Sequence, residues 1–171
     1  LMKRIFIDTN IIVDLIADRK PFSKYAIQIF QKAENTTLEG VDYYIWLDTE
    51  SEQPVWQFLL AIELKLGEAG AVIVSAGEDT DAIRVIQQEE LLKTAAALFR
   101  IHGKPVIQRA SRDHQAPWNG VMNSVLQAVR LSRGDEGHYL NDALMLDFGD
   151  KGLVIALNQD GGGLLIREHG G

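Results

Sequence analysis

Short apolar runs alternate along this chain with longer segments whose apolar residues recur at helical spacing. This alternation constrains the fold more than any other feature. It predicts strands at residues 5–8, 41–47, 71–75, 105–108 and 153–157, and helices at residues 10–17, 21–33, 59–66, 79–101, 121–131 and 138–148. Strands separated by helices form a mostly parallel sheet, because a parallel connection needs a crossover. We therefore predict an α/β fold with three layers, α/β/α, around a mostly parallel central sheet.

The chain has 171 residues, which suits a single domain spanning residues 1–171. Residues 102–134 are the least regular part of the pattern, and we expect an insertion or an irregular region there. The segment Gly161-Gly162-Gly163 marks a flexible turn near the end of the chain.

Composition excludes several classes of function. The chain has no cysteine, so disulfides and thiolate metal sites are excluded. Its net charge of −7 argues against a protein that grips a long stretch of nucleic acid, because such proteins are usually basic. No apolar run approaches the ~20 residues of a membrane span, so we predict no membrane contact and a cytoplasmic location.

One carboxylate, Asp8, follows the apolar run Ile5-Phe6-Ile7 directly. In parallel sheets, ligands bind outside the carboxyl ends of the strands, which is where Asp8 would lie. The N–H groups of the predicted helix after it would also favour an anion. An alternative reading is that Asp8 or Asn10 simply caps that helix.

The residues around Asp8 resemble the opening of PIN-domain nucleases, whose small bacterial members include VapC-like toxin ribonucleases. A strand ending Asp8-Thr9-Asn10 is followed by an apolar turn and by Arg19-Lys20-Pro21-Phe22 before a second helix. The likeness is strong over residues 4–34. It is weaker over 41–46, where Tyr43-Tyr44-Ile45-Trp46 stands, and over 141–160, which runs from Asn141-Asp142 to Asn158-Gln159-Asp160.

The resemblance implies a site of four carboxylates around a divalent cation. It implies catalytic roles for Asp8, Glu52, Asp142 and Asp160, and substrate-binding roles for Asn10 and Asn158. Asp8, Asp142 and Asp160 would hold Mg²⁺ or Mn²⁺, which prefer hard oxygen ligands. Glu50 and Glu63 are rivals of Glu52 for the second acid.

The resemblance further implies a metal-dependent endoribonuclease that hydrolyses phosphodiester bonds of RNA, as the toxin of a toxin–antitoxin pair. One alternative is a non-catalytic binding or scaffold module of the same fold. Another is a DEDD-type exonuclease, because Asp48-Thr49-Glu50 also follows an apolar strand.

Large apolar side chains suggest a partner. Trp46, Trp56, Phe58 and Trp118 exceed what the core of a small acidic nuclease needs, and an exposed apolar patch usually marks an interaction site. The family's toxins are blocked by an antitoxin segment. We therefore expect either a homodimer or a basic peptide of an antitoxin protein, with the homodimer preferred.

Overall fold

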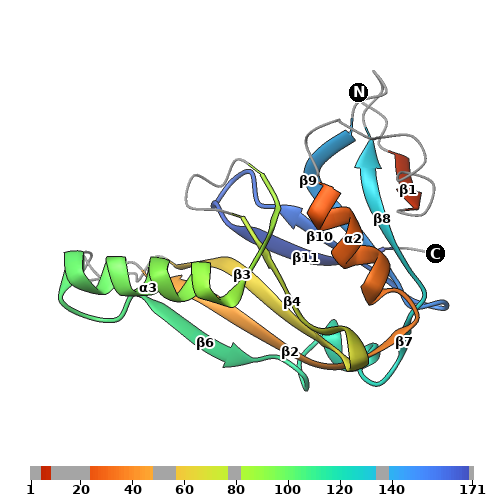
Figure 1. The fold of residues 1–171 in the computed structure, drawn as a ribbon, viewed down its shortest axis with the longest axis horizontal. Coiled ribbons are helices and arrows are strands. Elements are labelled where there is room, and N and C mark those ends of the chain that lie inside the picture. Colours follow the sequence, from red (N-terminus) through yellow and green to blue (C-terminus); the bar gives the residue numbers. More distant parts are fainter. Residues whose placement is uncertain (1–4, 9–23, 48–56, 77–81, 134–138, 170–171) are drawn as a thin grey trace.

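The computed structural model describes residues 5–8, 24–47, 57–76, 82–133 and 139–169, and strands predominate among them (Figure 1). The elements, in chain order, are β1 (Ile5–Asp8), α2 (Lys24–Ala33), β2 (Thr36–Leu47), β3 (Gln57–Leu66), the 3₁₀ turn η1 (Gly67–Ala69), β4 (Gly70–Ser75), β5 (Arg84–Ile86), α3 (Gln88–His102), β6 (Ile107–Ser111), the 3₁₀ turn η2 (Trp118–Gly120), β7 (Val125–Leu126), β8 (Ala128–Arg133), β9 (Tyr139–Asp147), β10 (Gly152–Leu157) and β11 (Leu164–His169).

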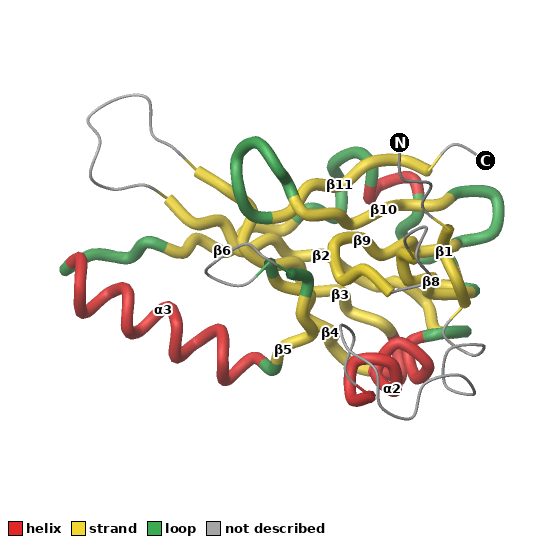
Figure 2. Tube along the Cα trace, turned by 90° about the horizontal axis from the view of Figure 1, so that it is seen from above, coloured by secondary structure: helices red, strands yellow, loops and turns green. Residues whose placement is uncertain are grey.

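The strands of the described residues join one curled, half-barrel sheet, and every pairing among them is antiparallel. The strand order is β1-β8-β9-β10-β11-β3-β2-β6; β4 pairs with β3 and β5, and β7 pairs with the start of β2. Figure 2 shows the strands gathered in one body, with α2 and α3 at separate places on its outside. The predicted three-layer α/β/α fold with a mostly parallel sheet is therefore wrong.

The error arose where apolar runs were assigned to helices. The predicted helix at 59–66 is part of β3, and the predicted helix at 138–148 is largely β9. In β3, Ala61 and Ile62 point to opposite faces of the sheet, yet both are fully buried. A strand covered on both faces loses its alternating pattern, so a short apolar run cannot be told from a buried helix.

Other predicted elements survive at the same positions. The strands predicted at 5–8, 41–47, 71–75 and 153–157 are confirmed within β1, β2, β4 and β10. The helix predicted at 21–33 is confirmed as α2 over its described part, and the one at 79–101 is confirmed from Gln88 onward. Residues 84–86 form β5 instead, and residues 121–131 contain no helix. The predicted helix at 10–17 lies outside the described residues.

The main core fills one side of the sheet, where α2 packs through Ala26, Ile27 and Phe30. Trp118 is fully buried in it, and its indole nitrogen donates a hydrogen bond to the Tyr43 hydroxyl at 2.6 Å. Trp118 is therefore a core residue and not part of an exposed patch. Among the described residues, no helix has the length and apolar character that crossing a membrane would require.

A smaller core on the opposite face of β2 and β3 connects α3 to the sheet. It contains Tyr44, Phe58, Ala61 and, from α3, Leu91. Figure 1 and Figure 2 both place α3 at one end of the molecule, far from the end that carries β1 and β8. β6 ends the strand order beside it, so the part of the chain that the structure describes adds no further strand to that edge.

The joint between the two halves of the sheet requires a glycine at position 163. β11 meets β3 through a single pair of residues, Leu164 opposite Leu59. Gly163, just before this pair, has φ +73°, and a Cβ there would lie 2.4 Å from the Leu59 carbonyl oxygen. A glycine is therefore required at position 163 by the left-handed backbone conformation and also by the close approach of the two strands.

We predict that Gly163→Ala lowers the free energy of unfolding by roughly 2–4 kcal/mol, because backbone strain and a clash with β3 add. Gly103→Ala is the matched control, since Gly103 has φ +71° but no atom within 4 Å of the added Cβ. The control should lose only about 1 kcal/mol. Urea unfolding of both variants measures the difference. Equal losses would show that the joint tolerates a side chain.

Candidate functional site

Two of the predicted acids lie on neighbouring parts of the sheet. Asp8 ends β1 opposite Arg130, and Arg130 is paired in turn with Met145 of β9. Asp142 lies three residues before Met145 and is partly buried. The resemblance implied a helical position for Asp142, whereas the structure places it in a strand. The side chain of Asp8 lies outside the described residues.

A third predicted acid, Asp160, belongs to the turn between β10 and β11. Asp160 is exposed there. The Asn158 side-chain oxygen accepts hydrogen bonds from the backbone N–H groups of Asp160 and Gly161, both at 3.2 Å. Asn158 is therefore engaged in shaping the turn.

Of the remaining candidate residues named from the sequence, the structure describes Glu63 but not the others. Asn10, Asp48, Glu50 and Glu52 lie outside the described residues, whereas Glu63 is buried in β3. Within the described ranges, no three His, Asp or Glu side chains gather as a metal site requires. Asp142 and Asp160 thus do not form a ligand group with a third described residue. The roles of Asp8 and Glu52, and the need for Mg²⁺ or Mn²⁺, stay predictions.

A buried polar network on β2, β3 and β6 was not predicted. Asp42 and Glu63 are cross-strand neighbours, and both side chains are buried. Arg109 of β6 donates to Asp42 Oδ2 from Nε at 2.9 Å and from Nη2 at 2.6 Å, and to Glu63 Oε2 at 2.9 Å. Lys65 Nζ lies 3.2 Å from Asp42 Oδ2. We call Asp42, Glu63, Lys65 and Arg109 the Arg109 network.

The Arg109 network stabilises the charged form of Asp42. Burial raises the pKa of Asp42, but the hydrogen bonds and charges of Arg109 and Lys65 outweigh burial, and the pKa lies below 3.8. The hydrogen bond to Asp42 likewise raises the pKa of Arg109. Burial, and then the charge of Glu63, raise the pKa of Tyr44, whose hydroxyl lies 3.4 Å from Glu63 Oε1.

The Arg109 network has a structural role. Two carboxylates face two cations, so the formal charges cancel inside the network, and the oxygens nearest Arg109 are already engaged. Arg109 comes from β6, the last strand in the order, and bonds to both β2 and β3. The network therefore fixes β6 and, through it, the position of the preceding helix α3.

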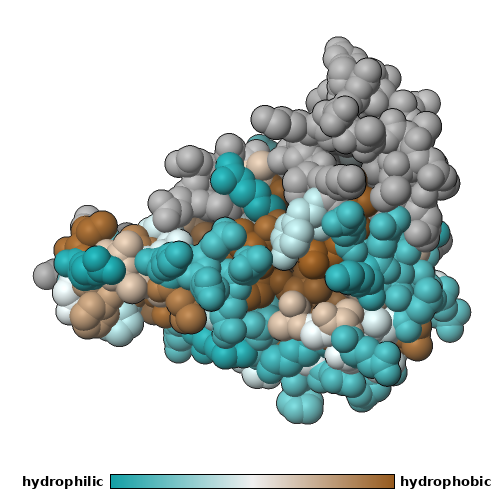
Figure 3. Space-filling model, in the orientation of Figure 1, coloured by the Kyte–Doolittle hydropathy of each residue, from teal (hydrophilic) through white to brown (hydrophobic). Residues whose placement is uncertain are grey.

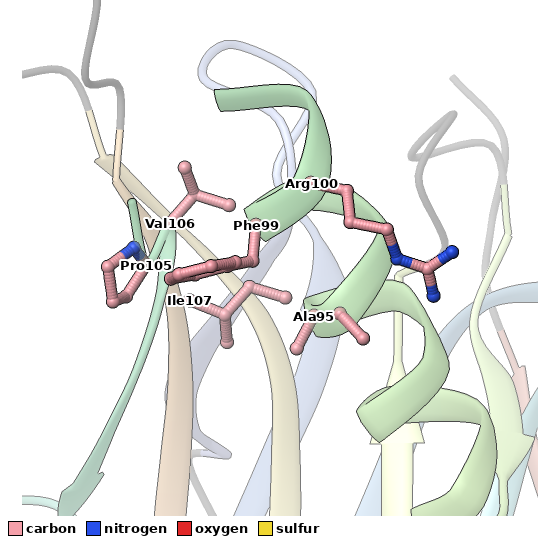
Figure 4. Close-up of a pocket in the computed structure, with 7 residues that line it drawn as sticks. Ala95, Phe99, Arg100, Pro105, Val106 and Ile107 are labelled. Carbon is pink, nitrogen blue, oxygen red and sulfur yellow. The ribbon is translucent and has the colours of Figure 1, made fainter. Parts of the chain in front are cut away.

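An apolar groove lies between α3 and the start of β6 (Figure 4). It has a volume of about 430 Å³ and is lined by Ala95, Ala96, Phe99, Arg100, Pro105, Val106 and Ile107. Figure 4 shows Phe99 pointing from the helix toward Pro105 and Ile107, while Arg100 points away from them. Side chains of both elements thus form apolar walls, with one guanidinium group at the rim.

Helix α3 carries three large exposed apolar side chains, of which Phe99 lines the groove. Leu92 is 60 % exposed and Phe99 is 50 % exposed, while Ile101, on another side of the helix, is 73 % exposed. Only Leu91 and Leu98 of α3 are buried. Figure 3 shows the resulting hydrophobic surface at the end of the molecule where α3 lies. The sheet thus leaves most of the helix's large apolar side chains exposed.

The predicted aromatic patch is not the exposed surface. Trp118 and Phe58 are buried, and Trp46 stacks on Phe58 with 5.3 Å between ring centroids. Trp56 lies outside the described residues. The sequence signal that could have indicated α3 instead is its breadth of apolar positions, because Leu91, Leu92, Leu98, Phe99 and Ile101 do not fit on one narrow face.

A second hollow, of about 360 Å³, opens near the start of α3 and contains Glu63, Glu89 and Tyr25 among its lining residues. The Glu63 carboxylate in its wall is already bonded to Arg109 and Tyr44. Part of the polar lining of this hollow is therefore already engaged within the protein, whereas the groove beside β6 has mainly apolar walls.

Comparison of the chain with protein-family models, curated proteins and solved structures gives no match.

We predict that Arg109→Met destabilises the fold most at neutral pH. At pH 7 the loss should be about 1–3 kcal/mol, less than for a fully buried ion pair because Arg109 is 48 % exposed. In the parent, the low pKa of Asp42 stabilises the fold above pH 3.8 and this contribution disappears as the pH falls through the folded value. Without Arg109, only Lys65 opposes the effect of burial on the pKa of Asp42, so the variant has less of this stabilisation to lose as the pH falls.

The difference between parent and variant should therefore stay constant from pH 7 to about pH 5 and shrink at lower pH, as measured by urea unfolding at several pH values. Arg112→Met is the control, because Arg112 lies over the Tyr43 ring at 5.3 Å and donates to Gln115, away from the two carboxylates. Its effect should be small and nearly independent of pH. A deficit for Arg109→Met that stays constant with pH would contradict the proposed role of the network.

Proposed function

We propose that this protein is a protein-interaction module whose α3–β6 groove receives an apolar segment of a partner. The observation that carries the proposal is the exposure of Leu92 and Phe99 on the helix that walls an apolar groove. Exposed apolar surface gathered beside a hollow is the usual mark of an interaction site.

The energetics favour occupation of the groove. Full burial of a Leu or Phe side chain contributes roughly 1.5–3 kcal/mol. With half or more of each side chain still exposed, Leu92 and Phe99 could each gain about 1 kcal/mol when a partner covers them. Apolar anchors that enter such a groove commonly supply most of the binding energy of an interface. A rim cation, Arg100, would add specificity rather than affinity.

This proposal shares the binding role of the non-catalytic alternative, without its PIN-like fold, and does not follow the ribonuclease prediction. The expectation that four acids converge depended on the crevice at the end of a parallel sheet, and the sheet is antiparallel. Hydrolysis of RNA, and an antitoxin as partner, now have only the residue pattern around Asp8 as support. They stay predictions.

The proposed function predicts that short apolar peptides bind in a manner that depends on Phe99. A random peptide library displayed on phage would be selected against the full chain, immobilised at low density. Selected peptides should carry apolar anchors, and their affinity should fall about tenfold or more on Phe99→Glu, because a charge would then line the groove.

Ile101→Glu is the matched control, since Ile101 is more exposed than Phe99 yet does not line the groove. Peptides should bind this variant as they bind the parent. Peptides that bind parent and Phe99→Glu equally, or a library that yields none, would contradict the proposed function.

A further inference from the structure

We propose that the occupant of the groove is helix α3 of a second copy of this chain, packed antiparallel about a two-fold axis. This inference rests on the proposed function, because it takes the α3–β6 groove as the docking site. The arrangement is isologous, so each contact between the two helices occurs twice.

The apolar side chains of α3 have the spacing that a facing helix needs. Leu92, Ala96 and Phe99 follow each other at intervals of four and three residues, so they form one stripe along the helix. In an antiparallel pair centred between Ala95 and Ala96, Leu92 lies opposite Phe99 of the other copy. The small side chains at the centre allow the two helices to approach closely.

The charges of α3 match the same orientation. Glu89 and Glu90 lie in its first turn, whereas Arg100 and His102 lie in its last turn. Glu89 and Arg100 are eleven residues apart, about three turns, and so lie on the same side of the helix. Antiparallel pairing therefore places Glu89 of one copy beside Arg100 at the groove rim of the other. Parallel pairing would instead bring like charges together.

The proposed interface uses only the face of α3 that carries the apolar stripe. Glu90 is one residue further along, about 100° around the helix, and points away from the stripe. Ala97 is separated from Ala96 in the same way. The chain thus provides a matched control residue next to Glu89 and another next to Ala96.

A charge-reversal series tests the pairing in the full chain, with dissociation constants measured by sedimentation equilibrium at low salt. A helix pair of this size is small for an interface, so we expect a parent dimer in the micromolar range. Glu89→Arg and Arg100→Glu should each weaken the dimer about fivefold or more, because two symmetric pairs become repulsive. The double variant should restore the parent's affinity to within about twofold. Glu90→Arg makes the same change in net charge outside the contact and should not weaken the dimer.

The double variant separates the interface from the stability of the helix. Both substitutions oppose the helix dipole, so effects on α3 itself would add, whereas effects on the interface should cancel. Circular dichroism of each variant checks that α3 is retained. A double variant that is weaker than either single variant would overturn the antiparallel pairing.

Cross-linking supplies a second readout, because the chain contains no cysteine of its own. Ala96→Cys should form a disulfide-linked dimer within minutes under mild oxidation, since the position lies next to the two-fold axis. Ala97 is also exposed but points away from the stripe, so Ala97→Cys should stay monomeric. Equal cross-linking of the two variants would overturn the proposed contact.

The outcomes separate this inference from the proposed function. A parent chain that stays monomeric at 200 µM, while selected peptides still bind through Phe99, would overturn the homodimer and leave the interaction module standing. That result would indicate a different protein as the occupant. A monomeric chain that binds no peptide would overturn both.

Discussion

Two buried carboxylates on adjacent strands must be neutralised, and the structure at this end of the molecule depends on how that is done. Asp42 and Glu63 are cross-strand neighbours and are buried, so their charges would oppose the pairing of β2 and β3 if nothing lay between them. Arg109 bonds to both. Lys65 of β3 neutralises Asp42 in part, but among these four residues only Arg109 of β6 bonds to both carboxylates. The electrostatic requirement of one hairpin thus fixes the position of a third strand.

The position of α3 follows from the same interaction. The helix ends at His102, and β6 begins at Ile107, so the connection between them is short. Leu91 inserts into the small core beneath the start of the helix, while Ile107 packs against that core from β6. With both ends held, the side of α3 that carries Leu92 and Phe99 has no other described element to cover it. The exposed groove is therefore a consequence of how β6 is anchored.

The sequence could predict strands whose apolar runs end at turn residues, even where both faces are buried, as in β10. β1 and β10 were placed correctly because turn residues bracket their apolar runs. β3 was assigned to a helix because Ala61 and Ile62 are both fully buried, which removes the alternation that identifies a strand. Because of this wrong assignment the Arg109 network was not predicted either, since Glu63 faces Asp42 only when residue 63 lies in a strand. The wrong prediction of a parallel sheet has the same cause. Two segments that were predicted as crossover helices, 59–66 and 138–148, are largely strands.

The groove could not be predicted for a different reason. The amphipathic pattern correctly predicted the helix that became α3, but it does not show which apolar residues the rest of the fold will cover. Exposure of Leu92 and Phe99 depends on the breadth of the sheet beneath the helix, and that breadth is set by long-range pairings such as Tyr44 with Arg109.

Net charge adds a last constraint on what the exposed side of α3 can bind. Two copies of a chain with net charge −7 repel each other at long range, and salt screens this repulsion over about 10 Å at 0.1 M. Contacts within a dimer act at shorter range, where the distribution of charge along α3 matters more than the total. Its acidic first turn and basic last turn let two copies attract at both ends of the helix while the molecules as a whole repel. A protein of this charge can therefore associate with itself through α3 only in one orientation, and that selectivity is what a small apolar groove alone would lack.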